Sequence, residues 1–348
     1  MPEIIHVDGA QRSGSGTIVR FATAFAALRR CPLHVTNARA KRQKPGLRPQ
    51  HVAAVRACAE LCGATTEGLA VGSREFTFIP GPKIRGGAFS WDIGTAGSTT
   101  MLALGILPVA CFAEAPVTAR ITGGVFQDFA PSPHHMQHVL APLLARMGAA
   151  VEVQVLRAGY VPRGGGVIEL RVRPVRGALA PLCLSEQGVI REVSGIAFSS
   201  HLEARNVSER MAQACTAALS AAGFSAHIER TLDTAASHAG ASLAIWATTS
   251  TGCILGADRA GALHRSSEAI GHFVAESLLT DLAAHATTDR HAADQLVLFA
   301  AVAAGSTRYV APTTTDHLET NLWLAEQFGA QGRCAQRGVE ITGLGLRR

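Results

Sequence analysis

The sequence predicts an α/β (α+β) fold, in which a large domain of three repeated α/β units carries an inserted, smaller α/β domain. Three observations predict it. Similar helical segments ending in Gly-Ala occur three times, the same elements precede each of them, and the spacing between them leaves room for one extra unit. The 348 residues, 47% of them hydrophobic and 17% charged, are enough for about two domains with sizeable cores.

The three similar segments are amphipathic helices. They cover residues 49–64, 133–149 and 316–330, and each ends in Gly-Ala. Within 133–149 the apolar residues recur at spacings of three and four, as they do on one face of a helix. Glycine directly after such a pattern is typical of a helix C-cap.

An apolar helix and a short strand precede each of these segments. The expected helices are 19–28, 100–112 and 292–304, and the expected strands are 33–36, 117–122 and 307–310. Each unit therefore reads helix, strand, loop, helix, strand, with further strands closing it. Units that pack together bury faces that one unit cannot bury alone.

The spacing of the Gly-Ala pairs predicts the insertion. Gly63 and Gly148 are 85 residues apart, whereas Gly148 and Gly329 are 181 apart. The excess contains its own expected elements, which are strands at 192–198 and 242–248 and helices at 207–222 and 266–284. We therefore predict a large domain of residues 1–182 and 285–348, with a small α/β domain of residues 183–284 inserted into it.

Net charge, cysteine content and the lengths of the apolar runs indicate the kind of partner and the location of the protein. The formal net charge of +6 and the pI of about 9.1 favour anionic partners such as nucleic acid or nucleotides. Eight scattered cysteines without a CxxC pair are interpreted as reduced core residues. The N-terminus does not resemble a signal peptide, and the longest apolar run, around 101–113, is too short for a bilayer. We expect a cytoplasmic protein without membrane contact.

Five segments combine glycines, cations or hydroxyls in ways that suit chemistry. They are 8–20, 39–51, 94–100, 160–166 and 313–317. The segment 39–51 places five cations in a loop just before a helix, which suits phosphate binding, although a solvated basic loop would look the same. The glycine turn at 8–16 runs into a helix but lacks the Gly-Lys-Ser/Thr ending of a Walker loop.

His317 stands at the start of the third repeated helix. The helix dipole there favours a neutral, nucleophilic imidazole and also attracts a phosphate. A neutral imidazole can form a covalent phosphoramidate with a nucleotide. The alternative interpretation is a surface histidine, one of fourteen in the chain.

Taken in order, these segments resemble the RNA 3′-terminal phosphate cyclase family. The resemblance covers nearly the whole chain and is most specific at Pro45–His51. The other matching stretches are 8–20, 39–44, 94–98, 123–124, 159–166, 249–253, 294–296 and the segment around His317. The family is built from three repeated α/β units and an inserted domain, in agreement with the repeat described above.

The resemblance implies an ATP-dependent reaction in three steps. A histidine, matched by His317, attacks the α-phosphorus of ATP and becomes adenylylated; AMP then passes to an RNA 3′-phosphate, and the 2′-hydroxyl closes a 2′,3′-cyclic phosphate. The implied partners are ATP, a divalent metal ion (Mg²⁺ or Mn²⁺) and RNA with a 3′-phosphate end. A homodimer is left open.

The resemblance also implies roles for individual residues. Arg39, Arg42 and Gln50 match positions that hold phosphate or RNA, and Asp294 and Ser13 match metal-binding positions. Those matching nucleotide-binding positions are His291, Ala292, Ala293, Asp294, Gln295, Pro131, Leu104 and Arg20.

Three residues depart from the family pattern. Ser13 replaces a usual glutamate, Leu104 a glutamine, and His291 a tyrosine that stacks on the adenine. Two alternatives therefore stay open, a non-catalytic cyclase-like RNA-binding protein of the ribosome-assembly type and a relative that transfers a nucleotide to another phosphate end. The non-catalytic relatives lack the nucleophilic histidine, so His317 favours catalysis.

Overall fold

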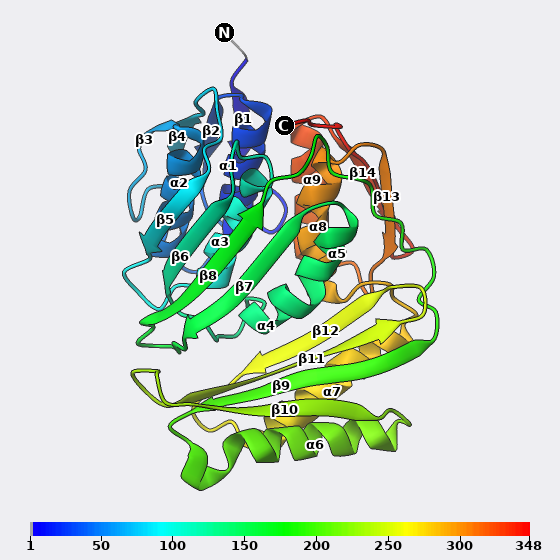
Figure 1. Cartoon of the computed structure of the whole chain (residues 1–348). Coiled ribbons are helices and arrows are strands. Elements are labelled where there is room, and N and C mark those ends of the chain that lie inside the picture. The colour runs from blue at the N-terminus through cyan, green and yellow to red at the C-terminus, as the bar shows by residue number, and fades with distance from the viewer. Residues whose placement is uncertain (1–2) are drawn as a thin grey trace.

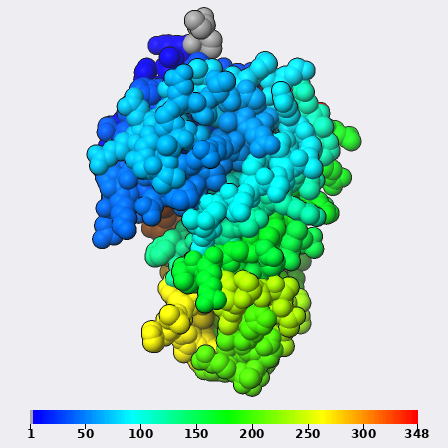
Figure 2. Space-filling view, turned by 90° about the vertical axis from the view of Figure 1, so that its left-hand side faces the viewer, coloured from blue at the N-terminus to red at the C-terminus, as the bar shows by residue number. Residues whose placement is uncertain are grey.

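Three small sheets, each with its own helices, stand side by side in the upper part of the molecule, and a fourth sheet lies below them (Figure 1). The computed structural model describes residues 3–348. Figure 2 shows the face on which the first unit (blue) and the second unit (cyan to green) lie above the inserted elements (green to yellow). The mixed α/β class predicted from the sequence is confirmed.

The first two units have the same topology. The first consists of β1 (Ile5–Asp8), α1 (Gly16–Arg29), β2 (Leu33–Thr36), α2 (Pro49–Cys62), β3 (Thr65–Glu67) and β4 (Phe76–Ile79). The second consists of β5 (Gly87–Asp92), α3 (Thr99–Ala110), β6 (Val117–Gly123), α4 (Pro133–His135), η1 (Met136–Leu140), α5 (Ala141–Arg146), β7 (Ala150–Arg157) and β8 (Gly166–Arg173). Their sheets have the orders β1-β2-β4-β3 and β5-β6-β8-β7, and in both only the first pair is parallel.

The third unit repeats this pattern with a reduced first strand. Its elements are α8 (Arg290–Val302), β13 (Ser306–Val310), α9 (Asp316–Gln327), β14 (Gln331–Ala335) and β15 (Gly338–Thr342), and its sheet has the order β13-β15-β14. A single parallel bridge between Cys183 and Arg308 occupies the place of β1 and β5. The central helices α1, α3 and α8 are apolar and buried on nearly all sides, as expected for helices packed between sheets.

The residues between Cys183 and α8 form a separate sheet covered by two helices. The elements are β9 (Ile190–Ser200), η2 (Glu203–Arg205), α6 (Val207–Ala221), β10 (Ala226–Asp233), β11 (Gly240–Thr249), β12 (Ile254–Ala260) and α7 (Ser267–Ala283). The sheet order is β10-β9-β11-β12, so its connectivity differs from that of the three units. The limits of 183 and 284 for an inserted domain stay a prediction. None of the helices in the described part of the chain is long and apolar enough to cross a membrane.

The second repeated helix is interrupted. The sequence predicts one helix over 133–149, but the structure has a π-helical turn, η1, between α4 and α5. Pro142 stands at the start of α5. Proline has no backbone N–H to donate and its ring clashes with the preceding turn, so the backbone widens ahead of it.

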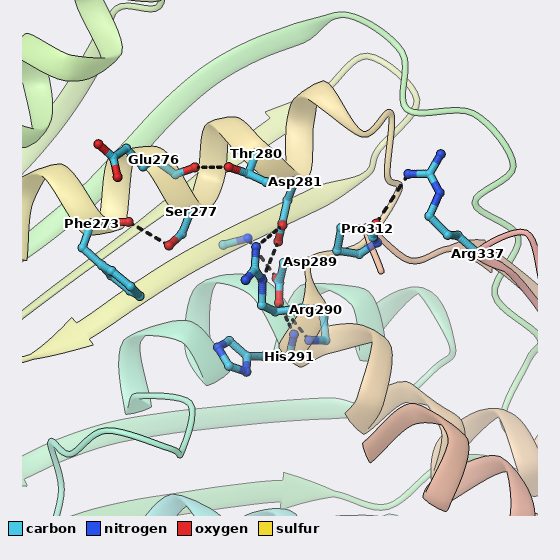
Figure 3. A network of polar contacts seen from close by, with 12 residues as sticks. Phe273, Glu276, Ser277, Thr280, Asp281, Asp289, Arg290, His291, Pro312 and Arg337 are labelled. Atoms are coloured by element: carbon cyan, nitrogen blue, oxygen red, sulfur yellow. Dashed lines mark hydrogen bonds and ion pairs between the residues drawn. The ribbon is translucent and has the colours of Figure 1, made fainter. Parts of the chain in front are cut away.

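One buried carboxylate joins the second unit, the third unit and the inserted sheet. Asp289 is the N-cap of α8, and its Oδ1 accepts hydrogen bonds from the backbone N–H groups of His291 (2.8 Å) and Ala292 (2.9 Å). Its Oδ2 accepts from the backbone N–H of Gly256 on β12 at 2.9 Å and lies 3.0 Å from His135 Nε2 on α4. Figure 3 shows this region, with Arg290 reaching Asp281 of α7 beside it.

Gly256 is packed so closely at this junction that no residue with a side chain fits at its position. A Cβ atom on Gly256 would lie 2.6 Å from Val139 Cγ2 and 2.9 Å from His135 Cδ2. Burial alone lowers the pKa of His135, but the Asp289 carboxylate outweighs burial and raises that pKa above its ordinary value of 6.5. The raised pKa favours the charged form of the His135 ring beside the Asp289 carboxylate.

We expect Asp289→Ala to lower the free energy of unfolding by about 3–5 kcal/mol, because it leaves His135 buried without its partner and α8 without its cap. Urea unfolding at pH 6 measures this. A matched control is Glu75→Ala, which removes the exposed partner of His34 and should cost under about 1 kcal/mol.

The difference in the free energy of unfolding between wild type and Asp289→Ala should depend on pH in one direction. The raised pKa of His135 means that the pair's contribution is fully present below pH 6.5 and is lost as the pH rises through the higher folded-state pKa. A difference between wild type and Asp289→Ala that grew with pH above neutrality would contradict the ion pair.

Candidate active site

Four helix N-termini from all three units meet at one cavity of about 400 Å³. They are the first turns of α1, α2, α3 and α9. The residues that line the cavity are Ser15, Gly16, Thr17, Arg20, Arg39, Arg42, Gln50, His51, Ser98, Met101, Gln127, Asp128, Phe129, Ala130 and His317. Each helix start carries free backbone N–H groups and a partial positive charge, so the convergence alone favours an anion.

Local sequence explains where these helices begin. Ser15, Ser98 and Thr315 are N-caps whose side-chain oxygens accept backbone hydrogen bonds from the first turns of α1, α3 and α9. Gln50, in the first turn of α2, accepts a 3.1 Å hydrogen bond through Oε1 from the backbone N–H of Ser98. This bond connects the first and second units at the cavity wall.

Arg20 is a buried cation without a carboxylate partner among residues 3–348. It is 5% exposed, and its Nη2 donates to Thr17 Oγ1 at 3.4 Å, while its Nε has no hydrogen-bond partner in the described part of the chain. Burial and the nearby Arg39 lower its pKa to about 10, so it is still charged at neutral pH. A buried, incompletely paired guanidinium is costly unless an anion binds to it.

Two more arginines extend the positive wall. The Arg39 Nη1 donates to the carbonyl oxygens of Lys44 (2.9 Å) and Gly46 (2.6 Å), which fixes the basic loop. Burial and the neighbouring arginines, Arg42 first among them, lower the pKa of Arg39. Arg42 is exposed and has no ion-pair partner within residues 3–348.

The carboxylate that lines the cavity is already paired. Asp128 Oδ2 accepts from Arg265 Nη2 at 2.8 Å, and its Oδ1 lies 3.4 Å from Arg259 Nε. Arg259 lies on β12, and Arg265 lies in the loop between β12 and α7. The charge of Asp128 is therefore neutralised, and the cavity as a whole is positive.

His317 projects into this cavity from the second position of α9. Its Nδ1 lies 3.3 Å from Thr17 Oγ1 on α1, which leaves Nε2 free among the described contacts. Burial is the largest cause that lowers the pKa of His317, and Arg20 and Arg42 lower it further. The ring is therefore neutral at pH 7 and carries an available lone pair.

Asp294 fixes the start of the helix that carries His317. It lies on α8, and its Oδ1 accepts a 2.5 Å hydrogen bond from Oγ1 of Thr315, the N-cap of α9. The amide of Asn321 on α9 also donates to the Asp294 carbonyl oxygen at 2.8 Å. Burial raises the pKa of Asp294 to about 7. Its contact with the histidine is indirect, through the cap.

His51 presents a neutral N–H group to the cavity. Its Nδ1 lies 3.1 Å from the backbone N–H of Arg48, which can only donate, so the ring proton belongs on Nε2. Burial, followed by the charge of Arg20 and three further arginines, lowers its pKa well below 6.5. Nε2 faces Gly16, where a Cβ atom would lie 2.1 Å away, so only glycine fits at that position.

The cavity brings together five of the residues singled out from the sequence. These are His317, Arg20, Arg39, Arg42 and Gln50. The remaining predicted residues do not line it. Leu104, Pro131, Ala292 and Ala293 are buried, and Gln295 is partly buried. Their predicted roles, like that of partly buried His291, stay predictions.

The residues present do not fit a protein-built site for a divalent metal ion. No group of three or more His, Cys, Asp or Glu side chains with metal-binding geometry occurs within residues 3–348. Asp294 is bonded to Thr315, and the Ser13 hydroxyl donates to Ser15 Oγ at 3.0 Å. Mg²⁺ and Mn²⁺ prefer several oxygen ligands including free carboxylates, which this arrangement does not provide.

Sequence reasoning missed several wall residues. Thr17 and His51 lay inside recognised segments, but only the fold shows that their side chains face His317 and the arginines. The segment from Gln127 to Ala130 follows the noted Gly123-Gly124 pair and carried no recognisable signal of its own.

The fold and the site define an α/β protein with a positive cavity and a neutral histidine suited to phosphate chemistry. The family model described as RNA 3′-terminal phosphate cyclase matches residues 11–332. Similar proteins include the RNA 3′-terminal phosphate cyclases of Pyrobaculum aerophilum, 34% identical over 99% of both chains, and Hyperthermus butylicus, 38% identical over 92% of this chain and 90% of that one. The cyclase of Pyrococcus furiosus is 36% identical over 93% of both.

The chain therefore belongs to the RNA 3′-terminal phosphate cyclase family, a family of ligases, and the predicted family and enzyme class are confirmed. Among solved structures, the enolpyruvyl transferase NikO from Streptomyces tendae covers 100% of this chain and 50% of its own, with a TM-score of 0.40 and 12% identity. That likeness is too weak to carry an argument.

We expect the His51 ring to be neutral, with its proton on Nε2, at pH 6.5 and above, because burial and the surrounding arginines oppose its protonation. Long-range ¹H–¹⁵N correlation spectra measure both properties, and His51→Gln assigns the signal. A midpoint above pH 6, or a proton on Nδ1, would show that the ring is not a fixed donor.

Proposed function

We propose that this chain converts an RNA 3′-phosphate to a 2′,3′-cyclic phosphate, using ATP and a covalent His317–AMP intermediate. The observation that carries the proposal is the neutral imidazole of His317 at a helix N-terminus, in one cavity with the incompletely paired cation Arg20. Family membership supports the reaction class, and the cationic wall supports phosphate substrates. The place of action that we propose is the cytoplasm.

In the first step, Nε2 of His317 attacks the α-phosphorus of ATP. The P–N bond forms as the P–O bond to pyrophosphate breaks. Thr17 holds Nδ1 and so fixes the direction of the lone pair, since one ring nitrogen is engaged and the other faces the cavity. Arg20 and the free N–H groups of α1 and α9 stabilise charge that develops on the phosphoryl oxygens.

In the second step, an oxygen of the RNA 3′-phosphate attacks the adenylylated histidine. The P–N bond breaks and an RNA–AMP anhydride forms, which frees the imidazole. We assign Arg39, Arg42 and Gln50 to the RNA phosphate, because they form the cavity wall on the first unit. The 2′-hydroxyl then attacks the 3′-phosphorus, loses its proton and expels AMP, which closes the cyclic phosphate.

We place the nucleoside of ATP beside the first turn of α8, near His291 and Asp294. This stretch of α8 lies beside the start of α9, because Asp294 accepts a hydrogen bond from Thr315, the N-cap of the helix that carries His317. We assign five further residues to the nucleoside of ATP, which are Pro131, Leu104, Ala292, Ala293 and Gln295. Mg²⁺ or Mn²⁺ that accompanies ATP would be held chiefly by the phosphate oxygens, given the few protein donors.

We expect wild-type protein incubated with α-labelled ATP and Mg²⁺ or Mn²⁺ to acquire a label that is acid-labile and alkali-stable. His317→Ala should abolish the label, because the nucleophile is removed. His272→Ala, which changes an exposed histidine of α7, is the matched control and should label normally.

A chase with RNA extends the same experiment. Only RNA with a 3′-phosphate should remove the label and become cyclised, whereas RNA with a 5′-phosphate or two hydroxyl ends should not. Absence of label in the wild type under conditions where ATP binds would overturn the catalytic proposal. Release by the 5′-phosphate alone would redirect it to the other end.

We expect adenylylation to decline in acid with a midpoint below pH 6.5, because attack needs neutral His317 and its pKa is lowered. Arg42→Ala removes one cause of that lowering, so the acidic limb should move up towards pH 6.5. Rates of single-turnover labelling between pH 4.5 and 8 measure it. An acidic limb that stayed in place or moved down would contradict the assigned cause.

A further inference from the structure

The rim of the cavity carries an aromatic ring that packs against nothing. Phe129 is fully exposed, at 101% of its reference area, and it lines the same cavity as Arg39, Arg42 and Gln50. Single exposed apolar residues are ordinary on protein surfaces. Phe129 differs because its backbone has a φ of 67°, in the left-handed region that bulky residues rarely adopt. Position and conformation together indicate a function for this ring.

Both ends of the segment that carries Phe129 are anchored on the inserted sheet. On one side Asp128 is held by Arg265 and Arg259, and on the other the backbone N–H of Ser132 donates to Asp258 Oδ2 at 2.6 Å. Arg265 is in turn bonded to the carbonyl oxygen of Ala260. The strained backbone is therefore held by its surroundings, so the ring is presented on a firm support.

We propose that Phe129 is the stacking platform for the 3′-terminal base of the RNA whose phosphate enters the cavity. This rests on the proposed function for the identity of the phosphate. Aromatic rings stack on the faces of unpaired bases and accept every base, which suits an enzyme that acts on an RNA end. In the terminal nucleotide of the RNA, the base and the 3′-phosphate are separated by one sugar. Phe129 at the rim and the arginines in the cavity wall offer a partner for each of them.

The ring belongs with the RNA rather than with ATP. Phe129 shares the cavity with Arg39, Arg42 and Gln50, the residues assigned to the RNA phosphate. His291 and Asp294, assigned to the nucleoside of ATP, do not line that cavity. A base stacked on Phe129 would keep the RNA end in place while the 2′-hydroxyl attacks.

The test measures binding of a fluorescent RNA with a 3′-phosphate by anisotropy, without ATP, at fixed salt. Phe129→Ala should weaken binding roughly tenfold, and Phe129→Trp should restore it. The same RNA with an abasic 3′-terminal residue should bind wild type and Phe129→Ala equally. Leu232→Ala, on the exposed face of β10, is the control for removal of an exposed apolar side chain.

Two further measurements separate stacking on the RNA base from a structural role and from stacking on the adenine of ATP. Phe129→Ala should leave the thermal unfolding midpoint and the ATP-dependent labelling of His317 unchanged. Unchanged RNA binding, or equal loss with the abasic RNA, would overturn the proposal. Lost labelling with intact RNA binding would also overturn it and would move the ring to the adenine. RNA binding is measured without ATP. If the wild type does not acquire the label from ATP, that result counts against the proposed function, but the RNA-binding test of Phe129 still stands.

Discussion

The position of His317 depends on a buried carboxylate far from it in the sequence. Asp289 caps α8 and ties it to α4 and β12. α8 then supplies Asp294, whose carboxylate bonds the Thr315 cap of α9, and α9 supplies His317. Two successive helix caps therefore connect Asp289 to the start of the helix that carries His317. Asp289 is fully buried and Thr315 is half-buried, and each cap accepts hydrogen bonds from backbone N–H groups of the first turn of its helix.

The positive groups that face the cavity repel one another in the folded protein. Three arginines and four helix N-termini face one space, and the lining carboxylate Asp128 is neutralised by arginines outside it. Burial is the largest cause of the lowered pKa values of Arg20, Arg39 and His51, and repulsion between neighbouring arginines adds to it. An anion bound in the cavity would offset this cost and so stabilise the folded protein. Burial, followed by the charges of Arg20 and Arg42, also lowers the pKa of His317, so the groups that attract an anion also favour the neutral imidazole.

The sequence predicted what depends on local pattern and repetition. Gly-Ala endings located the three units, and the basic loop and His317 were found because their residues are contiguous or begin a helix. The inserted sheet has four strands where two were predicted, since β10 and β12 lack a distinct signal. Asp289, Asp128 and Phe129 were missed because their importance comes from partners more than a hundred residues away or from a backbone angle.

The departures from the family pattern fall outside the cavity lining. Ser13, Leu104 and His291 do not line it, whereas the histidine, the arginines and Gln50 do. Ser13 is engaged with Ser15 and Thr320, and Leu104 is buried, so neither offers a charge to a substrate. The groups that the cavity offers to an anion are therefore Arg20, Arg39, Arg42 and the helix N-termini, and none of them depends on the three departures from the family pattern.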